Sequence, residues 1–317
     1  MIKRAVYSLI DFSSLVIKMI VIISILALAA KGITASINES KSNLNSPHYA
    51  LITLSGEIAA GRSFSSEKVN PLLIEALDSE VVKGIVIKVN SPGGSPVQAG
   101  RIYDQIVRGR ESHPEKKIIV VVDDICASGC YYIASAASEI YADKASIIGS
   151  IGVISSSFGF KGILDKVGIE HRTITAGEHK AFLDPYSELN PNEVEHWKKL
   201  LGKTHKQFIE AVTTGRGDQL KVGKESGIFD GLMWNGVDSM EMGMIDGLGD
   251  ENTAALESLG ELKLLEYRPE ESFIESIRKA TKEGVTSSAA EYVESYIDDT
   301  SKERFAMMMI AKKLNLK

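Results

Sequence analysis

A single serine stands where an expected strand turns into an expected helix, in the stretch "DDICASGCYYIASAA" (residues 123–137). It can cap the helix, whose first amides have no acceptor within the helix. It can instead present a nucleophile beside those amides, which stabilise a developing oxyanion. The general preference of serine for caps favours the first use. A catalytic Ser128 therefore requires a base and a second oxyanion donor elsewhere in the chain.

A glycine pair follows an earlier expected strand, in "NSPGGSP" (residues 90–96). Adjacent glycines let backbone amides approach a ligand closely. The carboxyl ends of parallel strands share one edge of a sheet, where ligands usually bind. We therefore expect the amides of Gly94 and Gly129 to lie together there and to form an oxyanion hole.

The base is harder to find, because none of the six histidines lies in a recognisable triad context. These are His48, His113, His171, His179, His196 and His205. The better candidate is Lys180, in "TITAGEHKAFLDPY" (residues 173–186). A lysine acts as a base only where burial and neighbouring groups lower its pKa, and the following "AFL" offers such burial. A lone loop lysine is more often a solvated charge.

Strands that alternate with helices must position these residues. Period and composition predict strands at residues 49–58, 84–90, 117–123, 139–143, 146–154 and 170–176, and helices at 67–80, 95–110 and 192–214. A glycine-punctuated region closes the domain near Asp250. This order predicts an α/β fold with a mainly parallel sheet covered by helices.

Composition excludes several classes of protein. The chain has 317 residues, of which 25% are charged and 44% hydrophobic, with a net charge of −6. The chain has no excess of basic residues that would indicate a nucleic-acid partner, and it has no Walker or zinc motif. The two cysteines, Cys126 and Cys130, form no disulfide framework, and we expect both to be buried small residues.

The N-terminal region is apolar and long enough to cross a membrane. Residues 12–34 are interrupted only by Lys18 and Lys31, near the ends of the span. Lys3 and Arg4 precede the segment, which places the N-terminus in the cytoplasm and the remainder outside. We therefore expect a single-pass protein of the inner or plasma membrane with an extracytoplasmic domain.

The alternative is a cleaved signal peptide, because residues 27–29, "ALA", resemble a cleavage site. The apolar stretch exceeds the usual signal core of about 7–15 residues, which favours a retained anchor. The predicted organisation is an anchor at residues 1–36, a linker at 37–48, a main domain at 49–250 and a helical C-terminal extension at 251–317.

Four ordered stretches together resemble one family. "NSPGG", "ASGCYYIASAA", "IIGSIGVI" and "TAGEHKAFLDP" are similar to motifs of the signal peptide peptidase A family of Ser-Lys proteases. The short, membrane-anchored SohB type is the nearest in organisation. The resemblance covers about residues 49–250, including the ending "GMIDGLGD".

The resemblance implies a ClpP/crotonase-like fold and a set of site residues. It assigns a nucleophile, a general base, a serine that orients the base and an oxyanion region: Ser128, Lys180, Ser150, and Gly93 or Gly94 with Gly129. It implies cleavage of remnant signal peptides and other membrane-derived or misfolded polypeptides, without a metal or other cofactor. It also implies ring-like homo-oligomers in which serine and lysine can come from neighbouring subunits.

The chain departs from the family pattern in two places. Cys130 stands where the family usually has glycine, and a side chain there could narrow the pocket or pair with Cys126 under oxidising conditions. Residues 273–317 exceed the family core. They could form a peripheral packing helix, or a tail that meets a ring neighbour, an active site or a membrane.

Two other functions compete with a protease. A crotonase-type acyl-CoA enzyme of the same fold holds a thioester enolate with glycine amides, but it needs neither the serine and lysine nor an anchor. An inactive membrane scaffold with the same fold would not react with an active-site serine probe.

Overall fold

The computed structural model describes residues 46–223, 226–260 and 263–268. All of them except Ser46 belong to one compact unit, Pro47–Pro269. In chain order the elements are β1 (His48–Ser55), α2 (Ser66–Asp78), β2 (Val82–Ser91), α3 (Pro96–Ser112), β3 (Lys117–Ala127), α4 (Gly129–Ala134), β4 (Glu139–Ala142), β5 (Ile147–Gly149), α5 (Lys161–Val167), α6 (Pro191–Arg216), β6 (Met233–Trp234), α7 (Gly236–Glu241), β7 (Gly247–Leu248), α8 (Glu251–Ala254) and β8 (Leu264–Glu266).

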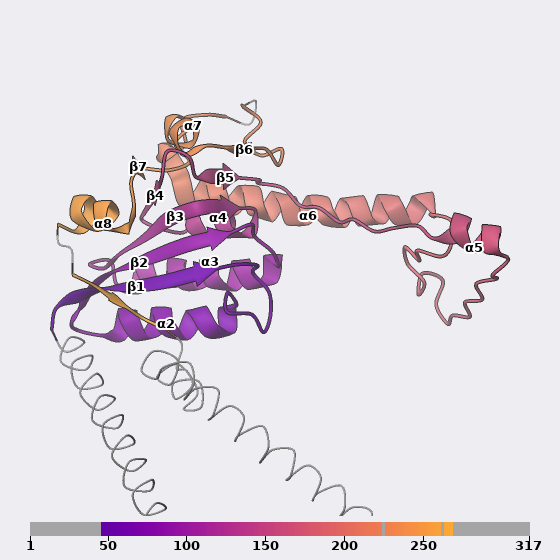
Figure 1. The fold of residues 1–317 in the computed structure, drawn as a ribbon, viewed down its shortest axis with the longest axis horizontal. Coiled ribbons are helices and arrows are strands. Elements are labelled where there is room, and N and C mark those ends of the chain that lie inside the picture. Colours follow the sequence, from indigo (N-terminus) through magenta and orange to yellow (C-terminus); the bar gives the residue numbers. More distant parts are fainter. Residues whose placement is uncertain (1–45, 224–225, 261–262, 269–317) are drawn as a thin grey trace, which may run out of the picture. The chain divides into compact units, whose positions relative to one another are not determined.

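The strands form one mainly parallel sheet in the order β6-β5-β3-β2-β1-β8 (Figure 1). Strand β4 pairs with β3 and also with β7. All these pairings are parallel except that of β5 with β6. The predicted α/β fold with a mainly parallel, helix-covered sheet is confirmed.

Helices cover both faces of the sheet. On one face, apolar residues of α2 and α3 such as Leu73 and Ile102 pack into the main core with Ile85 and Ile87 of β2. On the other face, Ala254 of α8 packs with a smaller apolar cluster. The centre of β2, Ile85–Ile87, is a continuous apolar run, which is typical of a strand that is buried on both faces of a sheet.

Strand β3 changes partners along its length, and this positions the end that carries Ser128. Its first half pairs with β4, from Ile119 to Val122, and its last residues pair with β5. The pairing with β2 shifts register between Val89 and Ser91. The carboxyl end of β3 therefore lies between β2 and β5.

Two strand predictions differ from the structure. Residues 170–176 form no strand, because this segment is exposed and pairs with no other part of the sheet. Only Ile147–Gly149 of the predicted strand at residues 146–154 is a strand. It ends there because Ser150 has a positive φ of 51°, which extended pairing does not allow.

Residues after Asp250 also contribute to the sheet. Strand β8 pairs in parallel with β1, so that Ala50 lies opposite Leu265. The predicted anchor at residues 1–36 and residues 269–317 lie outside the described residues. Within the part that the structure describes, no helix combines the length and apolarity that a membrane crossing requires.

Candidate active site

Ser128 occupies a strained position between β3 and α4. Its backbone has φ 54° and ψ −123°, and its side chain makes no capping hydrogen bond to α4. A non-glycine residue in such a region costs about 1–3 kcal/mol, and it persists only where the surroundings hold it. Here the Ser128 amide donates to the Gly149 carbonyl at 2.9 Å, and the Tyr132 amide donates to the Ser128 carbonyl at 3.0 Å. The hydroxyl is therefore not used as a helix cap.

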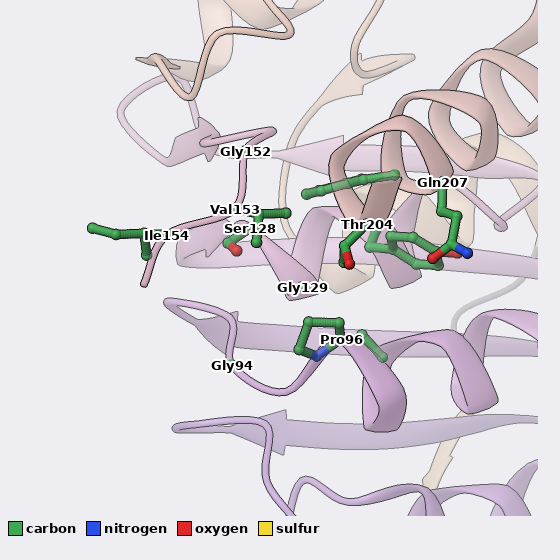
Figure 2. A pocket seen from close by; sticks show the side chains of 12 residues that line it. Gly94, Pro96, Ser128, Gly129, Gly152, Val153, Ile154, Thr204 and Gln207 are labelled. Atoms are coloured by element: carbon green, nitrogen blue, oxygen red, sulfur yellow. The ribbon is translucent and has the colours of Figure 1, made fainter. Parts of the chain in front are cut away.

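Ser128 opens into a pocket of about 150 Å³. Its lining is Gly94, Pro96, Ala99, Ser128, Gly129, Tyr132, Gly152, Val153, Ile154, Thr204, Gln207 and Phe208. Figure 2 shows Thr204 and Gln207 on α6 facing the loops that carry Gly94 and Ser128. Burial, and then the nearby Tyr103 and Asp104, raise the pKa of Tyr132, so its phenol stays neutral in the pocket wall. The lining combines apolar side chains such as Val153 and Phe208 with the polar side chains of Thr204 and Gln207.

The glycine loop lies against Ser128 with no room for side chains. A Cβ on Gly93 would lie 2.8 Å from the Ser128 Cβ, and one on Gly94 would lie 2.2 Å from the Ile58 carbonyl oxygen. Their φ values of 99° and 150° also favour glycine. Only glycines permit this approach of the backbone to the serine.

Two amides beside Ser128 are available to a ligand. Gly93 donates its amide to the Ser91 hydroxyl at 3.1 Å. The amides of Gly94 and Gly129 have no acceptor among the described residues, and the Gly94 nitrogen lies 3.4 Å from the position of a Cβ on Gly129. Two free amides next to a serine hydroxyl form the arrangement that stabilises an oxyanion.

Ser150 directly follows β5, the strand beside the end of β3. Ala127 is paired with Gly149 across β3 and β5, so the residues that follow them are neighbours. Like Ser128, Ser150 has a positive φ, and its amide donates to the Leu232 carbonyl at 2.6 Å. The structure thus brings Ser128, Ser150 and the predicted glycines together.

The structure does not bring Lys180 to Ser128 within one chain. Lys180 is exposed and lies between α5 and α6. This segment is attached to the first turns of α6, since the Leu183 amide donates to Glu193 at 3.1 Å and His179 contacts the same carboxylate at 3.2 Å. Figure 1 shows α5 beyond the N-terminal end of α6, away from the sheet.

Helix geometry gives the scale of this separation. The pocket touches α6 at Thr204, whereas the Lys180 segment is attached at Glu193. These positions are 11 residues apart, or about 16 Å along the helix axis at about 1.5 Å per residue. The four-carbon stem of a lysine is shorter than that. Lys180 is also absent from the lining of the pocket that Ser128 opens into, so this arrangement does not favour a Ser128–Lys180 pair in one chain.

No histidine replaces Lys180 in the pocket lining of the described residues. The nearest in sequence to a lining residue is His205, whose Nε2 lies 3.2 Å from the Ile151 carbonyl oxygen. In residues 46–223, 226–260 and 263–268, no group of acidic, histidine and cysteine side chains is arranged to hold a metal ion.

The two cysteines correct the expectation of unpaired buried thiols. Cys126 and Cys130 are joined by a disulfide, with their Cα atoms 5.1 Å apart. The turn from β3 into α4 brings these residues within the distance that a disulfide needs. Both are fully buried, as expected.

Sequence reasoning missed the contribution of α6 to the pocket. Thr204, Gln207 and Phe208 line it together with Tyr132. The helix itself is predictable from its pattern, and Phe208 is among its few buried residues. Which face of α6 meets Ser128 depends on packing, and no local signal marks it.

Comparison with known proteins assigns this chain to a family. The family model described as peptidase family S49 matches residues 110–266. The putative protease slr0021 of Synechocystis is 30% identical over 205 residues, which are 65% of this chain and 71% of that protein. The chain belongs to peptidase family S49.

Other relatives of this S49 chain have longer sequences. A putative signal peptide peptidase SppA of Enterococcus faecium is 29% identical over 60% of this chain and 53% of its own length. A Na(+)/H(+) antiporter NhaA of Brucella abortus is 41% identical over 198 residues, or 62% of this chain. The match covers 26% of that antiporter, so the chain spans about a quarter of its length.

Proposed function

We propose that this S49 protein is a serine endopeptidase with Ser128 as nucleophile and Lys180 as general base. The observation that carries the proposal is the strained Ser128, which lies at a pocket beside two amides without acceptors. Strain at a residue held by its surroundings is typical of catalytic positions. The ClpP/crotonase-like fold implied by the sequence is part of the same proposal.

The chemistry is an acyl transfer in two steps. The Ser128 oxygen attacks the peptide carbonyl carbon while the lysine amine accepts the hydroxyl proton. The amides of Gly94 and Gly129 stabilise the oxyanion that forms. The lysine returns the proton to the leaving amine, and water then hydrolyses the Ser128 ester. Gly93 leaves room for the close approach, and Ser150 orients the lysine.

We propose that Lys180 acts in the site of a neighbouring copy within a ring-like homo-oligomer. The separation along α6 supports this arrangement, since the segment that holds Lys180 is attached away from its own pocket. The region from Ile154 to Ile174, which leads into that segment, also exposes many apolar side chains, among them Ile154 (88% exposed), Phe158 (81%), Ile163, Val167, Ile169 and Ile174 (98%). Large exposed apolar patches mark interaction sites. Contact with a neighbour would also bury Lys180. Burial lowers the pKa of a lysine, so that its neutral amine can accept a proton.

The substrates that we propose are remnant signal peptides and other membrane-derived or misfolded polypeptides. A small pocket beside Ser128, lined in part by Ala99, Val153 and Phe208, suits small or apolar side chains before the scissile bond. The similarity to a protein named as a putative signal peptide peptidase supports the same class.

We further propose a membrane-anchored protein with its peptidase domain outside the cytoplasm. The charge pattern around residues 12–34 supports this topology. The Cys126–Cys130 disulfide also supports it, because disulfides persist in oxidising compartments. Protease added to intact spheroplasts should digest the domain, whereas protection until lysis would contradict the topology.

The experiment that tests the function uses the full-length chain in detergent with a fluorophosphonate probe and a peptide substrate. The wild type should be labelled at Ser128, and Ser128→Ala should be unlabelled and inactive. Mixing inactive Ser128→Ala with inactive Lys180→Ala subunits should restore activity, because each copy supplies the residue that the other lacks. Absence of labelling in the wild type would refute the peptidase assignment. Labelling without restored activity would refute only the sharing between copies.

A further inference from the structure

A disulfide spans the nucleophile of the proposed peptidase. Cys126 lies two residues before Ser128 and Cys130 two residues after it, and the bond joins them across the turn. Both cysteines are fully buried. The disulfide therefore links the strand that leads into the nucleophile directly to the helix that leaves it.

On the strand side, Cys126 is held by both neighbouring strands. It lies opposite Ser91 of β2 and opposite Ile148 of β5. Ser91 is also the residue whose hydroxyl accepts the Gly93 amide at 3.1 Å. The first sulfur is thus anchored in the part of the sheet from which the glycine loop departs.

On the helix side, Cys130 follows directly on Gly129, whose amide is one of the two free donors. Helix α4 has only six residues. Because a short helix has little stability of its own, external ties must set its position. The position of the Cys130 sulfur therefore affects the direction of the Gly129 N–H.

Ser128 itself needs such ties, because its φ of 54° is unfavourable for a residue with a side chain. Two hydrogen bonds hold its backbone, one from its amide to Gly149 and one to its carbonyl from Tyr132. The first bond ties Ser128 to the end of β5, and the second ties it only to its own helix. The disulfide adds a covalent link from α4 back to β3.

We propose that the Cys126–Cys130 disulfide is a positioning element that holds Ser128 and the Gly129 amide in reactive geometry. The inference rests on the proposed peptidase function and adds a residue pair that the Ser-Lys mechanism does not itself require. Because the two sulfurs act through one bond, loss of either should have the same effect as loss of both.

The first measurement establishes the bond in the working protein. Active full-length chain is alkylated without reductant and digested, and the Cys126–Cys130 peptide should be recovered in its linked form. Treatment with a dithiol reductant should convert the bond to two alkylatable cysteine thiols while the reductant becomes a disulfide. Recovery of both thiols alkylated from the active, unreduced protein would overturn the proposal.

The second measurement compares Cys126→Ala, Cys130→Ala and the double variant. Each should show the same fall of about 10- to 100-fold in kcat and in the rate of Ser128 labelling by a fluorophosphonate, the scale of a small misplacement. KM should change little, because the pocket walls from α6 are untouched. Equal effects of the single and double changes identify a joint unit, whereas additive effects would indicate separate packing contributions and overturn the proposal.

Ile133→Val serves as the matched control for loss of stability. Ile133 is a buried residue of the same helix and does not line the pocket, so the change should lower Tm and leave labelling unchanged. If the cysteine variants behave like this control, the disulfide is only structural and the proposal fails. An unlabelled wild type would refute the peptidase function instead, so the two failures are distinguishable.

Discussion

The amide of Ser128 donates to the carbonyl of Gly149 at 2.9 Å, which joins the candidate nucleophile to the strand that ends just before Ser150. Both serines have positive φ, 54° and 51°, and each follows the last residue of its strand. Two neighbouring parallel strands thus end in the same unusual conformation. The pairing places two hydroxyl-bearing residues together at the edge where the pocket opens.

Lys180→Arg should be nearly inactive, because arginine stays charged and cannot accept the serine proton. Peptidase activity and oligomeric state of the full-length variant are the measurements. His179→Ala, which changes the adjacent residue in the same exposed segment, is the matched control and should keep most activity. The reverse pattern would make histidine the base.

Gly94→Ala should abolish turnover and also lower stability. Its new Cβ would lie 2.2 Å from the Ile58 carbonyl oxygen, so the loop must move away from Ser128. Loss of one oxyanion donor typically costs about 100–1,000-fold in rate. Gly129→Ala should fold normally, since its Cβ would meet nothing closer than 3.4 Å. Normal kcat in Gly94→Ala would remove Gly94 from the oxyanion hole.

His205→Ala should lower kcat/KM by about fivefold, the value of one hydrogen bond of about 1 kcal/mol. Its Nε2 contacts the Ile151 carbonyl and so ties α6 to the segment between Ser150 and Gly152. His205→Gln, which retains a donor, should recover much of the loss. Lys206→Ala is the control, because Lys206 is exposed and pairs only with Glu210 within the helix. Equal loss in both alanine variants would contradict a positioning role for His205.

Asp246→Ala should lower the free energy of unfolding by about 3–5 kcal/mol, because it leaves the buried charge of Arg216 without a countercharge. Arg216 has a fully buried side chain and contacts both Asp246 oxygens at 2.8 and 2.9 Å. Denaturant unfolding gives the value. The exposed pair of Lys161 and Asp165 offers a control, and Asp165→Ala should cost far less than Asp246→Ala. Similar losses would show that burial of the arginine has no energetic consequence.

Glu139 should stabilise the fold at neutral pH and lose this effect in acid. Partial burial raises the pKa of Glu139, but hydrogen bonds from Lys117 and Ser258 outweigh burial and hold it below the ordinary 4.5. A lowered folded-state pKa stabilises above the unfolded pKa and loses its effect as pH falls through the folded value. Glu139→Gln should therefore cost about 1 kcal/mol at pH 7, and the difference from wild type should shrink as the pH falls below the ordinary pKa of 4.5 and through the lower folded-state pKa. A difference that grows in acid would contradict the sign.

Local sequence determined most of the secondary structure near the site. The apolar, β-branched run of β3 and the Ser95-Pro96 start of α3 are strong signals of secondary structure, because they act through neighbouring residues alone. The predicted strand at residues 170–176 failed for the opposite reason. A strand needs a partner, and no sheet edge is available to that segment.

The candidate site divides in the same way. The sequence by itself singled out Ser128 and the glycine loop as candidates, because motif spacing around a strand-to-helix turn is a local property. The role of Lys180 stays a prediction. Only the tertiary structure decided that α6 walls the pocket and that a disulfide crosses the turn. Only the tertiary structure showed that the Lys180 segment and the pocket contact different parts of α6. These relationships depend on how distant segments pack, and the strength of a local pattern contains no information about which faces meet.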